Sequence, residues 1–203
     1  MYLTKIDLEL SNRAVCAALG DCQKMHRMIN GLFDDSRQNI RLLYRVNNRG
    51  RNCSVYLYSS IPIRTEKLLP FMTLEGQRDL SAWLDAMDEG MRFRFDVLTM
   101  PSKKEPQHNG KNSRRRILKT ADERMAWMER KAAQNGFVLL QMREQESIAF
   151  LGKHPEELGG SMNWSSYHYT GVLEIQDAVT FRRAMEEGIG PEKAYGLGMI
   201  LLA

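Results

Sequence analysis

The amino-acid sequence predicts an α+β protein with two tandem ferredoxin-like domains. From residue 91 onward, the apolar pattern gives the order strand, helix, strand, strand, helix, strand, which RNA-recognition domains also use. The first half begins the same order and then loses it, so its domain looks like a degenerate copy. A chain of 203 residues accommodates two domains of about 100 residues each. We therefore expect domains over 1–89 and 90–203.

The first domain is expected to begin with a strand over 1–10, where apolar and polar residues alternate. Asp21 is expected to cap a helix whose apolar residues recur at i, i+3, i+4 and i+7. These residues are Met25, Met28, Ile29 and Leu32. Two further strands, over 40–46 and 53–58, are expected to form a hairpin. Residues 78–88 fit either a helix or an irregular strand.

The second domain has clearer signals. Residues 91–98 alternate as a strand does, and Thr120 with Glu123 forms a capping box that opens a helix ending at Gly136. Asp177 is expected to cap the last helix. The remaining strands are expected at 137–142, 148–151, 167–175 and 199–202.

Composition limits the classes of protein that this chain can belong to. No apolar run approaches the ~20 residues that a membrane-spanning helix needs, and the N-terminal residues lack the apolar core of a signal peptide. We therefore expect a cytoplasmic protein with no membrane partner. The three cysteines form no C-x-x-C pair and the four histidines are scattered. The sequence therefore predicts neither a metal site nor a cofactor.

The segment from Lys103 to Lys119 is strongly basic, although the whole chain carries a net charge of only +4. It contains seven basic residues and a single acidic one, Glu105. A local surplus of this kind is expected where a protein grips a polyanion, although a solvated loop would have the same composition. The candidate RNA-binding residues here are Lys103, Lys104, Lys111, Arg114, Arg115, Arg116 and Lys119.

A glycine-rich segment near the end of the chain is a second candidate for phosphate binding. Four glycines, Gly188, Gly190, Gly196 and Gly198, bracket Lys193. Without a Cβ, such a loop can bring its backbone N–H groups close to another surface. Backbone N–H groups and a lysine together form a plausible cradle for phosphate.

His26 is the leading candidate for proton transfer. It is expected at the edge of the apolar stripe of the first helix, where a side chain is partly exposed. Its unperturbed pKa of about 6.5 allows it to give or take a proton near neutral pH. A lone helix histidine is, however, more often structural than catalytic.

The amino-acid sequence of several segments resembles that of the CasE subfamily of CRISPR repeat-RNA endoribonucleases. The glycine-rich residues 188–198 carry the strongest likeness. The first strand followed by His26 and Phe33, the Pro101–Lys103 segment with its arginine cluster, and residues 126–131 also match. The likeness is poor only over 62–89.

The resemblance implies a metal-independent endoribonuclease that processes guide RNA. It implies that the protein binds a CRISPR repeat stem-loop, cuts once at the 3′ base of the stem by attack of a 2′-OH, and stays bound within the Cascade complex beside its other subunits. His26 would be the general acid or base. Where family members often carry a tyrosine, this chain has Gln23. Gln23, Lys24 and Arg27 are therefore the candidates to support His26.

Two other functions remain open from the sequence. The chain could be a non-catalytic RNA-binding module in which His26 is structural, an alternative that Gln23 keeps open. It could also be an assembly subunit held only by protein contacts, which the basic segment disfavours. Cleavage of RNA in EDTA distinguishes an endoribonuclease from a non-catalytic RNA-binding module. Salt-dependent RNA binding distinguishes both of these from an assembly subunit held by protein contacts.

Overall fold

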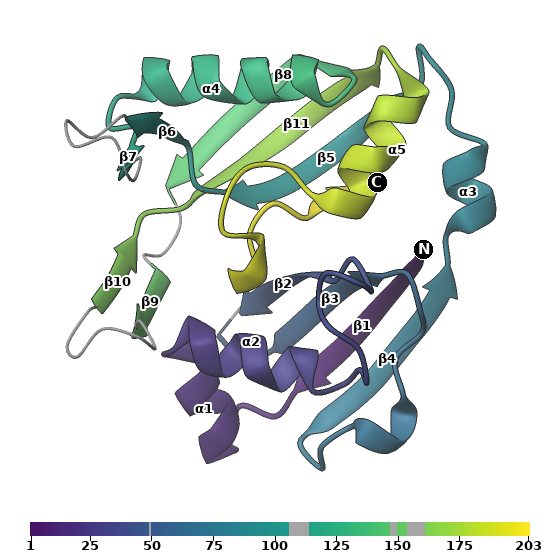
Figure 1. The fold of residues 1–203 in the computed structure, drawn as a ribbon, viewed down its shortest axis with the longest axis vertical. Helices are drawn as coiled ribbons and strands as arrows, with labels where there is room; N and C mark the ends of the chain where they lie inside the picture. The colour runs from purple at the N-terminus through teal and green to yellow at the C-terminus, as the bar shows by residue number, and fades with distance from the viewer. Residues whose placement is uncertain (49, 106–113, 147–149, 154–160) are drawn as a thin grey trace.

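The computed structural model describes the whole chain except residues 49, 106–113, 147–149 and 154–160, and only the backbone of residues 114, 146, 150–153 and 161–164. It has two four-stranded antiparallel sheets with helices, one sheet in each half of the chain (Figure 1). The predicted α+β class and the tandem arrangement are therefore confirmed. Within the described residues, no helix has the length and apolar character needed to cross a membrane.

The N-terminal sheet has the strand order β2-β3-β1-β4, which is the ferredoxin-like order. Its strands are β1 (Tyr2–Leu8), β2 (Leu43–Asn48), β3 (Cys53–Ser59) and β4 (Met72–Asp79). Helices α1 (Arg13–Leu19) and α2 (Cys22–Asn30) connect β1 to β2. Asp21 caps α2 as predicted, because its side chain accepts hydrogen bonds from the backbone N–H groups of Gln23 and Lys24.

This domain is degenerate where the sequence was hard to interpret. Only a short 3₁₀ turn, η1 (Thr65–Lys67), stands between β3 and β4 where a second helix is usual. Within 78–88, the structure has the end of β4 followed by helix α3 (Ser81–Asp85). Strand β4 lies at the sheet edge and exposes most of its residues, so it lacks the alternation that would have revealed it.

The C-terminal sheet has the equivalent order β12-β5-β11-β8. Its strands are β5 (Arg92–Thr99), β8 (Phe137–Glu146), β11 (Tyr167–Ile175) and β12 (Ile200–Leu202), and its helices are α4 (Ala121–Gln134) and α5 (Ala178–Glu187). The capping box of Thr120 and Glu123 and the Asp177 cap are present. Gly136 has φ 77°, which only glycine adopts easily after a helix.

Two segments outside this sheet differ from the sequence-based expectation. The basic segment is not a simple loop, because β6 (Ser102–Glu105) and β7 (Arg114–Ile117) pair as an antiparallel hairpin. The strand expected at 148–151 is β9 (Phe150–Lys153), and it pairs with β10 (Ser161–Trp164) in a separate two-stranded sheet. Residues 148 and 149 lie outside the described part of the chain.

One hydrophobic cluster spans the two domains. Leu43 and Tyr58, from the N-terminal sheet, belong to the same buried cluster as Trp127 and Phe181 of the C-terminal domain. A second core cluster lies inside the N-terminal domain and includes Ile29 of α2. Burial of apolar side chains between the domains therefore holds them together. The apolar side of α2, the helix that carries His26, packs into the second cluster.

Candidate functional site

The glycine-rich loop follows α5 and contains a short 3₁₀ turn, η2 (Lys193–Tyr195). A Cβ on Gly198 would lie 2.3 Å from the Ile189 carbonyl oxygen, and one on Gly196 would lie 3.0 Å from the Tyr44 ring. The loop therefore approaches its own protein closely, so the glycines serve packing as well as turning. All four have left-handed φ angles: 69° at Gly188, 78° at Gly190, 83° at Gly196 and 82° at Gly198.

This loop joins the two domains at the helix that carries His26. In Figure 1 the yellow segment after α5 reaches towards α2 and β2, and η2 contacts both elements. The Tyr195 hydroxyl accepts a hydrogen bond of 2.6 Å from the Gln23 side-chain amide. The rings of Tyr195 and His26 lie edge to face with centroids 6.0 Å apart. Two segments separated by 172 residues therefore form one site.

His26 is half-buried in this site and has an open hydrogen-bonding position. Its Nδ1 atom is buried without a hydrogen-bond partner. Burial lowers the pKa of the imidazole below its usual value, and the charges of Arg37 and Arg27 lower it further, against an opposing backbone contact with Ala194. The neutral ring that results near pH 7 is the form that can accept a proton.

Arg37 acts electrostatically on both His26 and Lys193, and so connects the helix with the glycine-rich loop. Lys193 is half-buried, and burial lowers the pKa of its ammonium group, as do the charges of Arg37 and Lys131, while Glu187 acts in the opposite direction. Arg37 lies in the connection between α2 and β2. An anion bound here would compensate for positive charge that is partly removed from water.

The three residues predicted to support His26 have different surroundings. Gln23 contacts Tyr195. Arg27 is exposed, donates a 3.4 Å hydrogen bond to the Gln23 carbonyl and acts on His26 through its charge. Lys24 is exposed, and its backbone N–H takes part in the Asp21 cap.

The basic hairpin β6–β7 presents a second cationic surface, and its residues are not equivalent. The Arg116 guanidinium forms ion pairs with Glu105 at 2.6 Å and Glu123 at 3.5 Å, so its charge is largely balanced within the protein. Lys103 also approaches Glu105, at 3.7 Å. In contrast, Lys104 and Lys119 are exposed, as is Arg115.

The hairpin is electrostatically linked to the glycine-rich loop through Arg115. Burial lowers the pKa of Lys131 on α4, and the charges of Arg130 and Arg115 lower it further. Burial raises the pKa of Glu192, and the charge of Arg115 opposes that shift. Lys131 in turn acts on Lys193. Lys111 and the side chain of Arg114, both predicted RNA contacts, lie outside the described part of the chain.

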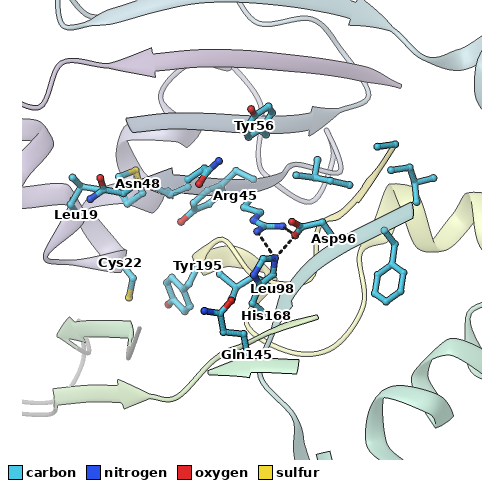
Figure 2. Close-up of a pocket in the computed structure, with 18 of the residues that line it drawn as sticks. Leu19, Cys22, Arg45, Asn48, Tyr56, Asp96, Leu98, Gln145, His168 and Tyr195 are labelled. Carbon is cyan, nitrogen blue, oxygen red and sulfur yellow. Dashed lines mark hydrogen bonds and ion pairs between the residues drawn. The ribbon is translucent and has the colours of Figure 1, made fainter. Parts of the chain in front are cut away.

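Sequence reasoning missed Tyr195 and Arg37. Both are placed by contacts between residues far apart in the sequence, although the position of Tyr195 inside the glycine-rich loop was a usable signal. The structure also contains a cavity of about 790 Å³ between the two sheets (Figure 2). There Arg45 pairs with Asp96, and His168 Nε2 lies 2.8 Å from the same carboxylate. This network ties β2 to β5 and β11, and Tyr195 lines the same cavity. Among the described residues, no group of three metal-ligating side chains occurs.

Comparison with known proteins identifies the family. The family described as "CRISPR associated protein" matches residues 1–203. The chain is 28% identical to "CRISPR-associated endoribonuclease Cse3" of Thermus thermophilus over the full length of both chains. It is 25% identical to "CRISPR system Cascade subunit CasE" of Escherichia coli, covering 100% of this chain and 99% of the relative.

A solved structure described as "CRISPR endoribonuclease Cse3 bound to 19 nt RNA" superposes with a TM-score of 0.86, at 26% identity and complete coverage of both chains. The E. coli Cas6e crystal structure superposes with a TM-score of 0.75 at 23% identity, covering 100% of this chain and 99% of the other, and supports the fold. The full-length match, the two curated relatives and the shared architecture lead to one conclusion: the chain belongs to the CRISPR associated protein family, in its CasE (Cse3) branch of endoribonucleases.

Proposed function

We propose that this protein is a metal-independent endoribonuclease that binds the stem-loop of CRISPR repeat RNA and cuts it once, at the 3′ base of the stem. The observation that carries the proposal is the contact between the glycine-rich loop and α2, in which Tyr195 meets Gln23 and His26. Lys193 belongs to the same short turn of the loop. The RNA-bound structure of the Cse3 relative supports RNA as the ligand.

In the proposed reaction, the 2′-OH of the nucleotide before the cut attacks its own phosphorus in line. His26 takes the 2′ proton as general base, the bond from phosphorus to the 5′-oxygen breaks, and that oxygen takes up a proton. The products are a 2′,3′-cyclic phosphate and a 5′-OH. Because the nucleophile belongs to the RNA, the protein supplies positioning, proton transfer and charge stabilisation.

The hairpin β6–β7 is the proposed grip on the RNA stem. Exposed Lys104, Arg115 and Lys119 contact phosphates, because side chains cannot read the deep major groove of A-form RNA. Many phosphate contacts to an intact stem make product release slow. The protein therefore stays with the guide RNA in the cytoplasm and joins the other Cascade subunits, as the name of the E. coli relative suggests.

Cleavage in the presence of EDTA tests the proposal. The purified protein is incubated with the stem-loop repeat RNA of its own CRISPR array, and with the same RNA carrying a 2′-deoxy residue at the cut site. We expect one cut in the first RNA, none in the second, and equal binding of both. Mapping the ends identifies the cyclic phosphate.

The alternative is a non-catalytic RNA-binding module of the same fold. Gln23 favours it, since an amide cannot exchange a proton as a phenol can. Tight binding of the unmodified RNA without a cut would support this alternative and end the catalytic proposal. Cutting that requires added divalent metal would leave an endoribonuclease but contradict the mechanism.

The rate of cleavage is expected to fall as the pH is lowered. His26 must be neutral to accept a proton, and burial with nearby cations lowers its pKa. The cleavage rate at subsaturating protein, which reports the free enzyme, should therefore be level near pH 7. It should decline with a midpoint below the usual histidine value of about 6.5. A cleavage rate that rises as the pH is lowered would instead indicate that His26 acts as the general acid.

A further inference from the structure

Arg37 is a partly buried arginine for which the described residues supply no ion-pair partner. Its Nε atom is buried and makes no hydrogen bond, and the side chain is only partly exposed. No carboxylate forms an ion pair with it in the described part of the chain, and no carboxylate counts among the groups whose charge acts on it. Among the other partly buried arginines that the structure describes, Arg45 pairs with Asp96, Arg124 with Glu144 and Arg116 with Glu105. Arg182 has no carboxylate partner either, but its guanidinium donates a 3.0 Å hydrogen bond to the Met87 carbonyl.

The groups around Arg37 increase this imbalance. Its charge reaches both His26 and Lys193, because it lowers the pKa of each. It also reaches Tyr44, whose hydroxyl is buried without a hydrogen-bond partner. The Arg37 carbonyl accepts a 3.0 Å hydrogen bond from the Leu42 N–H, which fixes the backbone from which the side chain extends.

A buried cation without a counter-ion is unfavourable unless the site receives an anion in use. The guanidinium group presents a planar fork that matches two oxygens of a phosphate, whereas lysine offers a point charge. We propose that Arg37, together with Lys193, binds the two non-bridging oxygens of the scissile phosphodiester beside His26, and that it is a phosphate-binding residue of the cleavage reaction. This inference rests on the proposed function above.

The chemistry explains why such a residue is needed. As the 2′-oxygen adds to phosphorus, negative charge accumulates on the non-bridging oxygens before the 5′-oxygen leaves. A preorganised guanidinium stabilises that charge more than the charge of the ground state. Because the same cation lowers the pKa of His26, it also keeps the neighbouring imidazole ready to accept the 2′ proton.

Arg37→Ala and Arg37→Gln test the role, with Arg78→Ala as the matched control. Arg78 is an exposed arginine on β4, at the opposite edge of the N-terminal sheet from β2. We expect single-turnover cleavage to fall about 10²- to 10³-fold in both Arg37 variants, with little change for Arg78→Ala. Affinity for the 2′-deoxy RNA should change far less. Guanidinium at millimolar concentration should restore part of the rate to Arg37→Ala alone.

A second readout needs no RNA. In the folded Arg37→Ala protein, an NMR titration should show a higher pKa for His26, since one of the nearby positive charges is gone. Arg37 variants that fold, melt as the wild type does and cleave at the wild-type rate would overturn the proposal. So would a rate loss explained by weaker binding of the 2′-deoxy RNA. A wild type that never cuts would instead contradict the proposed function.

Discussion

Replacing His26 with alanine is expected to lower the single-turnover rate of RNA cleavage by about 10²- to 10⁴-fold, the range that a general base contributes. The imidazole is half-buried beside Tyr195, and its Nδ1 atom has no hydrogen-bond partner among the described residues. The measurement is the rate with saturating protein in EDTA, followed by the affinity for the 2′-deoxy RNA.

Binding separates a catalytic loss from a structural one. His26→Ala should bind the 2′-deoxy RNA nearly as tightly as the wild type, because the proposed phosphate contacts lie on the hairpin and on Lys193. Arg13→Ala, which removes an exposed side chain from α1, provides a surface control and should cut normally. If His26→Ala retains the wild-type rate, His26 is not the base, and the site must be assigned again around Tyr195.

Replacing Gly198 with alanine is expected to destabilise the protein and slow cleavage together. Gly198 has φ 82°, and a Cβ there would lie 2.3 Å from the Ile189 carbonyl oxygen. The loop is fixed at this point by hydrogen bonds from Ile189 N–H to Gly198 and from Gly198 N–H to Leu98. The loop must therefore move, which costs about 2 kcal/mol or more and displaces Tyr195 from α2.

Gly90 offers a matched control for the backbone strain. It has a similar φ of 80°, but no atom lies within 4 Å of where its Cβ would be. Gly90→Ala should therefore show only the strain of a left-handed residue, as a smaller fall in the melting temperature, with cleavage intact. Equal effects of the two substitutions on melting and cleavage would mean that the loop does not position the site.

Much of the fold could be predicted because its signals are local. The Asp21 cap, the capping box at Thr120 and the alternating strand at 167–175 all depend on neighbouring residues and were confirmed. Strand β4 was missed because an exposed edge strand needs no apolar alternation. The pairing of the basic segment into a hairpin was missed because Lys and Arg carry no strand signal of their own.

The candidate site was only half predictable, for a related reason. His26, Gln23 and Lys193 could be named from residue type and position. That Gln23 is hydrogen-bonded to Tyr195 depends on how two domains pack, and neither sequence segment contains that information. The isolation of Arg37 depends on which carboxylates are absent around it in space. Whether a side chain has an ion-pair partner depends on tertiary packing, so it cannot be predicted from the neighbouring sequence.

The long separation between Gln23 and Tyr195 also affects when the site can exist. A ribosome that adds 5–20 residues per second needs roughly 10–30 s to pass from one to the other. During that time α2 can already have folded, yet it lacks the phenol and the ammonium group that the glycine-rich loop brings to it. The proposed cleavage site is therefore incomplete in the nascent chain, and RNA near the ribosome meets the complete site only after synthesis has passed the loop.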